Sequence, residues 1–174
     1  LLQTSRHLVT RIQTEARNIV TDLRDDSDHN DDLATALRHL ASRQAPSAPT
    51  FALDLASDLP PLPKHTVHHL RMIAQEAVTN ALKHSAARNI QIALHHSPTH
   101  LTLTVSDDGI GVEPTSLITG QPGHFGCMGI RERCRKIHAD VNWTSEQGSG
   151  TQVTVLMPLR LSLYTSDAAD EEDS

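Results

Sequence analysis

The hydrophobic and polar positions along the chain follow two different periods, which predicts a mixture of helices and strands. Apolar residues recur at helical spacing over residues 1–23, 32–43, 64–84 and 128–137. They recur at every second position, as in strands with one buried face, over residues 51–55, 90–95, 101–105, 141–145 and 151–157. Because the later strands are close neighbours in the sequence, we expect hairpins. The expected fold class is therefore α/β, a two-layer sandwich with a mixed sheet and helices on one face.

Pro46 and Pro49 indicate a linker between the first helices and the rest of the chain. We therefore expect a helical element over residues 1–45 and the main domain over residues 46–160. An acidic run over residues 25–32 separates the first two helices, and Asp31 or Asp32 can cap the second helix. Residues 161–174 have no apolar pattern, and we interpret them as a disordered, non-native tail.

The charge and composition of the chain narrow its function classes. The formal net charge of −6 is concentrated in the tail, whose acidic residues are Asp167, Asp170, Glu171, Glu172 and Asp173. The remaining body is near neutral, which argues against direct binding of nucleic acid. No window approaches the roughly 20 apolar residues of a membrane-spanning helix. Cys127 and Cys134 belong to no CxxC or Cys/His ladder, so neither a disulfide framework nor a zinc site is predicted.

Polar side chains recur along one face of the predicted helix over residues 64–84. Glu76, Asn80 and then Lys83 or His84 are one helical turn apart. An amide oxygen is a suitable Mg²⁺ ligand, and a cation offsets phosphate charge, so this stripe could hold a metal-bridged polyphosphate. A solvated helix face is the more frequent explanation for these residues taken alone.

Three glycine-containing segments add to this stripe. The run Asp107-Asp108-Gly109-Ile110-Gly111 places a carboxylate at the end of an apolar strand, where it can accept a hydrogen bond from an adenine amino group. Such Asp-Gly turns are also common without any ligand. A second segment, residues 123–133, is a glycine-rich loop that runs into a helix and lacks a Walker Gly-Lys-Ser/Thr. The third, residues 148–151, is a tight turn before the last strand.

In this order and spacing, the segments resemble the N, G1, G2 and G3 boxes of one ATP-binding domain. That domain is shared by sensor histidine kinases and the gyrase, heat-shock chaperone and mismatch-repair ATPases. The runs over residues 75–85 and 123–133 resemble the sensor histidine kinases that partner LuxR-type response regulators. The resemblance extends from Leu8 to Leu159. It implies that residues 1–45 are partial dimerisation and histidine-phosphotransfer helices and that residues 46–160 are the ATP-binding catalytic domain.

The resemblance also implies roles for individual residues. Asn80 would ligate the Mg²⁺ on ATP, and Glu76 would act as a base or orient the phosphoryl acceptor. Asp107 would accept the adenine amino hydrogen. The remaining nucleotide-binding residues would be Lys83 and His84 near the phosphates, Gly109 and Gly111 at the adenine, Gly126 and Gly129 in a mobile lid, and Thr151 beside the base.

The implied activity is transfer of the ATP γ-phosphoryl group to a histidine upstream of this chain, for relay to a response regulator. The full-length protein would form a homodimer through the N-terminal helices. We expect this segment in the cytoplasm, and anchoring of the full-length protein in the bacterial inner membrane is left open. The sequence departs from the family at His7, which is followed by Leu8 rather than Asp, and at Ile137-His138-Ala139-Asp140, where the family usually has Gly-Gly.

Two alternatives belong to other function classes. An anti-sigma-factor-type protein serine kinase shares the ATP-binding fold but lacks a dimerisation helix pair, and the apolar stripe over residues 1–23 argues against it. A non-catalytic nucleotide-binding interaction module is the other alternative. The presence of Glu76, Asn80 and Asp107 argues against that one.

Overall fold

The computed structural model describes residues 32–42, 49–111 and 125–159. The helices are α2 (Leu33–Ser42), α3 (Lys64–His84) and α5 (Phe125–Lys136). The strands are β1 (Thr50–Leu55), β2 (Asn89–His96), β3 (His100–Asp107), β4 (Asp140–Glu146) and β5 (Gly150–Pro158). Each of these elements was expected from the sequence, with bounds that differ by at most a few residues. The expected helix over residues 1–23 and the expected tail over residues 161–174 lie outside the described residues.

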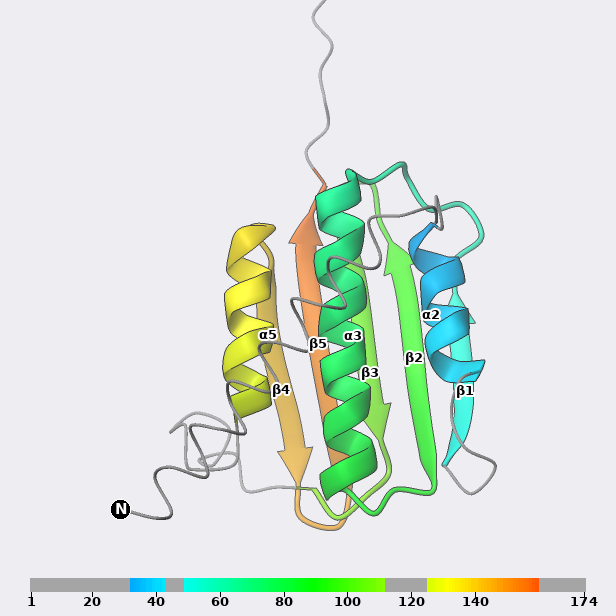
Figure 1. Cartoon of the computed structure of the whole chain (residues 1–174), viewed down its shortest axis with the longest axis vertical. Coiled ribbons are helices and arrows are strands. Elements are labelled where there is room, and N and C mark those ends of the chain that lie inside the picture. Colours follow the sequence, from blue (N-terminus) through cyan, green and yellow to red (C-terminus); the bar gives the residue numbers. More distant parts are fainter. Residues whose placement is uncertain (1–31, 43–48, 112–124, 160–174) are drawn as a thin grey trace, which may run out of the picture. The chain divides into compact units, whose positions relative to one another are not determined.

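The strands form one five-stranded mixed sheet in the order β1-β2-β3-β5-β4. β1 and β2 are parallel, since α3 crosses over between them, and the other neighbouring pairs are antiparallel. The expected two-layer arrangement is confirmed, because α2, α3 and α5 all cover the same face of the sheet (Figure 1). None of the helices in the described ranges is long and apolar enough to cross a membrane.

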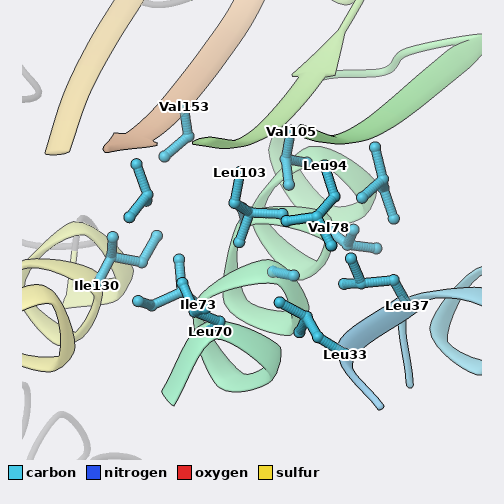
Figure 2. Close-up of a cluster of buried hydrophobic side chains, with 14 of the residues drawn as sticks. Leu33, Leu37, Leu70, Ile73, Val78, Leu94, Leu103, Val105, Ile130 and Val153 are labelled. Carbon is cyan, nitrogen blue, oxygen red and sulfur yellow. The ribbon is translucent and has the colours of Figure 1, made fainter. Parts of the chain in front are cut away.

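The hydrophobic core lies between the sheet and the three helices. α3 is the central helix, and it packs against α2, α5 and the middle of the sheet. Figure 2 shows Leu103, Val105 and Val153 projecting from their strands toward Leu70 and Ile73 of α3. Truncating a fully buried leucine or isoleucine of this kind to alanine typically costs about 2–5 kcal/mol. The core therefore fixes the position of α3 relative to the sheet.

α2 packs into this same core, which bears on the domain boundary. Leu33 and Leu37 are 2% and 0% exposed and lie in one cluster with Leu70. The Asp32 carboxylate accepts a hydrogen bond from the Thr35 N–H at 2.7 Å, and this bond holds the pKa of Asp32 below its usual value. Asp32 is thus the N-cap. We propose that the main domain begins at Asp32 rather than at residue 46, because the boundary expected from the prolines separates α2 from its packing partners.

The turn from α5 into β4 forms without the glycine pair usual in the family. Ala139 N–H donates to Cys134 O at 2.9 Å, and His138 N–H donates to Arg135 O at 3.2 Å. Hydrogen bonds of this pattern at a helix end require one residue in the left-handed backbone conformation. His138 is in that conformation, with φ 54°. The missing glycines therefore leave the fold intact.

Candidate functional site

α3 places the polar stripe predicted from the sequence at one end of the domain. The helix begins directly after Pro63, which has no N–H to leave unsatisfied at that position, and it buries the apolar face that includes Ala77 and Ala81. Glu76 and Asn80 are half-buried beside this face. Lys83 and His84 are exposed in the last turn, where the helix dipole favours cations.

Glu76 lies within electrostatic reach of the first turn of α5, which packs against α3. The thiol of Cys127 in that turn is buried, and burial raises its pKa. The charge of Arg131 opposes this shift, and the charge of Glu76 adds to it. The charge of Glu76 therefore acts on a buried thiol in the helix that packs against α3.

A second carboxylate, Asp107, ends β3 in a half-buried position. Its Oδ1 accepts a hydrogen bond from the Gly109 N–H at 2.9 Å. Among the residues that the structure describes, no other donor contacts this carboxylate. Most of its acceptor capacity is thus available to a ligand.

The neighbouring carboxylate, Asp108, has a different role. Its Oδ1 accepts from the backbone N–H groups of Arg88 and Asn89, both at 2.8 Å, and its Oδ2 accepts from Asn89 Nδ2 at 2.7 Å. The hydrogen bonds from Asn89, followed by that from Arg88, lower the pKa of Asp108. Asp108 therefore ties the end of β3 to the start of β2.

Two glycines after Asp108 allow a close approach of backbone segments. A Cβ on Gly109 would lie 2.1 Å from the carbonyl oxygen of Ser85, which itself accepts the Ile110 N–H at 2.8 Å. Gly111 has φ 66°, and a Cβ there would lie 2.0 Å from the carbonyl oxygen of Glu146. The turn after β3 is consequently pressed against both the end of α3 and the end of β4, and no residue with a side chain fits at either position.

Thr151 stands next to Asp107 in the sheet, because the two are register partners on β5 and β3. On its other side, the register partner of Thr151 is Ser145 of β4, and the two hydroxyl oxygens are 2.9 Å apart. Ser145 Oγ also donates to the carbonyl oxygen of Gly150 at 2.9 Å. Ser145, Thr151 and Asp107 thus form one row across three adjacent strands, called here the polar row.

The structure gathers most of the expected site residues at one end of the domain. Figure 1 shows the end of α3, the end of β3, the start of α5 and the β4–β5 hairpin at this same end. Gly126 and Gly129, expected in a lid, lie within the first turns of α5, which begins at Phe125. A Cβ on Gly129 would meet no atom within 4 Å. The preceding part of the glycine-rich segment lies outside the described residues.

The sequence analysis assigns no role to Ser145 or Asp108, although both have clear structural roles at this end of the domain. The hairpin turn is the sequence feature that could have indicated the role of Ser145, because a turn over residues 147–149 makes Ser145 the register partner of Thr151. The partners of Asp108 are 19 and 20 residues away in the sequence, so no local pattern indicated them. Within the described ranges, no group of three or more His, Cys, Asp or Glu side chains is placed to hold a metal ion.

The fold and these residues match one class of protein. The family model of the histidine kinase-, DNA gyrase B- and HSP90-like ATPases matches residues 65–161, and the chain belongs to this family. The resemblance to ATP-binding domains deduced from the four sequence segments is therefore confirmed.

Particular relatives narrow the resemblance within the family. The nitrate/nitrite sensor protein NarX of Escherichia coli (strain K12) is 34% identical over 107 residues, which are 60% of this chain and 17% of NarX. The sensor protein NarQ homolog of Haemophilus influenzae is 33% identical over 97 residues, covering 55% of this chain and 16% of the relative. The chain thus spans about a sixth of the length of these relatives.

A solved structure agrees with the sequence relatives. The histidine kinase domain of the blue-light activated histidine kinase from Erythrobacter litoralis EL346 superposes with a TM-score of 0.55 and is 27% identical. The match covers 72% of this chain and 57% of that one. The expected similarity to sensor histidine kinases is confirmed by these comparisons, and neither alternative class is favoured by them.

Proposed function

We propose that this chain is the ATP-binding catalytic part of a sensor histidine kinase and that the site described above binds Mg·ATP. The observation that carries the proposal is the Asp107 carboxylate. It is half-buried at the end of a strand, and its one donor in the described part of the chain is the Gly109 N–H. A partly buried carboxylate with unused lone pairs can accept a further hydrogen bond from a ligand. The exocyclic amino group of adenine is a donor of the right kind.

The polar stripe of α3 fits the triphosphate end of the same ligand. Asn80 offers a neutral oxygen of the type that Mg²⁺ prefers, and Lys83 and His84 offer exposed donors one turn further along. Bound Mg²⁺ would neutralise charge that develops on the transferring phosphoryl group. Asn80 would hold the metal, and Lys83 and His84 would orient the phosphate oxygens.

Glu76 is the proposed base, or the residue that orients the acceptor. In the reaction, a histidine imidazole nitrogen forms a bond to the γ-phosphorus while the bond to the ADP oxygen breaks, and ADP leaves. The half-buried Glu76 carboxylate, one turn before Asn80, would accept the proton that the imidazole nitrogen gives up.

The wider assignments follow from the relatives and extend the proposal beyond this chain. NarX and the NarQ homolog are sensor proteins, so we propose a response regulator as the partner that receives the phosphoryl group. The sequence motifs favour a LuxR-type regulator. Formation of a homodimer through the N-terminal helices of the full-length protein, and anchoring of that protein in the inner membrane, are proposals of the same kind.

The binding part of the proposal is tested by titrating the 174-residue chain with Mg·ATP, as the unsubstituted protein and as Asn80→Asp. The substitution replaces a neutral ligand with a charge beside the phosphates, so it should weaken binding of Mg·ATP. Unchanged affinity would remove Asn80 from the site. No binding of ATP by the unsubstituted chain would contradict the proposed function itself.

The chemical part requires the full-length protein, because the phosphoryl acceptor is proposed to lie upstream. Glu76→Gln keeps the shape of the side chain and removes the base. It should slow phosphoryl transfer by about 10²- to 10⁴-fold, which should exceed any change in ATP affinity. Transfer at the parental rate would remove Glu76 from this role. Acid-labile phosphate on the isolated chain would show that the acceptor is one of its own histidines and would contradict the upstream assignment.

A further inference from the structure

The polar row contains a hydroxyl whose hydrogen-bond direction is fixed by its neighbours. Ser145 has a single hydroxyl hydrogen, and the carbonyl oxygen of Gly150, 2.9 Å away, can only accept. Ser145 therefore donates to Gly150. In the 2.9 Å contact between the two hydroxyls, Ser145 must then accept and Thr151 must donate.

The direction of this bond determines what Thr151 presents to a ligand. Its own hydrogen is directed toward β4, so the oxygen retains lone pairs and acts as an acceptor on its remaining sides. Val105 and Val153 project toward the helices in Figure 2, and Asp107 and Thr151 are each two positions from one of them. Because side chains of a strand alternate between faces, Asp107 and Thr151 lie side by side on that same face. The site end of the sheet therefore presents two adjacent acceptors.

Two adjacent acceptors discriminate between purine bases. An amino group at the six-position can donate to both, whereas a six-oxo group brings a third acceptor against them and leaves buried lone pairs unpaired. Without Ser145, the Thr151 hydroxyl could rotate and donate to the Asp107 carboxylate. That rotation would use part of the acceptor capacity that an amino group needs, and it would also make Thr151 a possible donor to a six-oxo group.

We propose that Ser145 is a positioning residue that sets base specificity by holding the Thr151 hydroxyl hydrogen away from Asp107. The inference rests on the proposed binding of ATP, and it adds a residue of β4 that does not itself contact the base. A merely structural role of Ser145 would affect the binding of all purine nucleotides alike. The proposed role instead affects the ratio of affinities for amino- and oxo-purines.

The test measures the affinities of the chain for ATP and for inosine triphosphate, which carries a six-oxo group. Ser145→Ala should lower the preference for ATP by about 2- to 10-fold, the range for one neutral hydrogen bond. Ser145→Thr keeps a hydroxyl and should retain most of the preference. Ser149→Ala, an exposed serine of the same hairpin, is the matched control and should leave the preference unchanged.

A double-mutant cycle separates action through Thr151 from a general effect on the hairpin. Thr151→Val removes the hydroxyl, so Ser145→Ala should have no further effect on the preference in that background. The inference is overturned if Ser145→Ala leaves the preference for ATP at the parental value. It is also overturned if Ser145→Ala lowers this preference by the same factor in the parent chain and in the Thr151→Val variant. An unsubstituted chain that binds no ATP would be a different result, and it would overturn the proposed function together with this inference.

Discussion

Two consecutive carboxylates at the end of β3 stand in opposite surroundings. On the Asp108 side, the carboxylate is exposed and is surrounded by donors from Arg88 and Asn89 of the chain itself. On the Asp107 side, the carboxylate is half-buried and receives one donor, Gly109 N–H, from the described residues. The exposed Asp108 carboxylate therefore has its hydrogen bonds supplied by the chain itself, whereas the less exposed Asp107 carboxylate can still accept hydrogen bonds.

The comparison shows how a structural carboxylate differs from a binding one when the sequence is Asp-Asp. Asp108 closes the connection between α3 and β2, so its contribution is to stability. Asp107 is the last member of the polar row and directly precedes the glycine turn, where backbone segments are too close for any side chain. The surroundings of Asp107 and those of Asp108 can be changed by separate substitutions. The following predictions are ordered from the largest expected change in stability or affinity to the smallest.

The largest effect is expected from changing the backbone on the Asp107 side. Gly150 has φ 83°, and a Cβ there would lie 1.9 Å from the carbonyl oxygen of Asp107. Gly150→Ala should lower the free energy of unfolding by about 2–5 kcal/mol, through the clash and the left-handed conformation together. Denaturant unfolding measures this change.

Gly148→Ala is the matched control for this substitution. Gly148 has a similar φ of 82°, but nothing lies within 4 Å of a Cβ at that position. It should cost only the conformational part, about 1–2 kcal/mol. Equal losses for the two alanine variants would mean that the close approach to Asp107 contributes nothing.

The next effect concerns the ligand. Asp107→Asn replaces one carboxylate oxygen with an NH₂ group that would face the adenine amino group, donor against donor. Because hydrogen bonds to charged groups contribute about 1.5–3 kcal/mol, ATP affinity should fall roughly 10- to 100-fold. Asp108→Asn removes the same charge one residue along and should leave ATP affinity nearly unchanged. A similar loss of affinity for inosine triphosphate in the Asp107 variant would show that the base does not contact Asp107.

A smaller effect on stability should distinguish the Asp108 side by its pH dependence. The folded pKa of Asp108 is below its ordinary value of 3.8 because Asn89 and Arg88 donate to the carboxylate. A depressed folded pKa stabilises the fold above the ordinary pKa, and this contribution is lost as the pH falls through the folded value. Thermal melts between about pH 4 and pH 2 should therefore show a shallower loss of stability for Asp108→Asn than for the parent chain.

Asp32 shares this pH window, because its hydrogen bond to Thr35 also lowers its pKa. The Asp108 variant should consequently keep a residual dependence on pH in the same window. Substituting Asn at both positions should flatten the curve further. A curve for Asp108→Asn that is parallel to the parent curve would contradict the stabilising role of Asp108.

The sequence predicted the elements of this domain better than their tertiary partners. The bounds of α3 were predicted because Pro63 stops the preceding segment and the apolar face is continuous. α5 begins at Phe125, three residues before the predicted start. The prediction missed this turn because glycines at 126 and 129 weaken the helical pattern of the sequence. The assignment of α2 to a separate domain followed the local proline signal. Only the burial of Leu33 and Leu37 shows that α2 belongs to the core.

The candidate site was predictable where it depends on local spacing. The positions of Glu76 and Asn80 follow from helical periodicity, and that of Asp107 follows from the end of an apolar strand. The hairpin turn indicates that Ser145 pairs with Thr151, but the direction of the hydrogen bonds in the polar row depends on the contact of Ser145 with the Gly150 carbonyl oxygen, which the sequence does not indicate. Whether a carboxylate binds a ligand or holds the chain together depends in the same way on distant backbone donors.

The smallest expected effect tests whether the two sides are independent. Ala86, in the connection that Asp108 ties to β3, has φ 50°, which is unfavourable for alanine by about 1–2 kcal/mol. Ala86→Gly relieves this strain, and the greater flexibility of glycine in the unfolded chain offsets part of the gain, so stability should rise by about 0.5 kcal/mol. The measured quantity is the denaturant midpoint. His138→Gly is a second variant that relieves the same kind of strain, since His138 has φ 54° in the turn before β4. ATP affinity should stay at the parental value in both variants, because neither residue belongs to the polar row or the stripe of α3. A change in affinity for Ala86→Gly but not for His138→Gly would mean that the Asp108 side transmits strain to Asp107, and the separation between the two carboxylates would then be wrong.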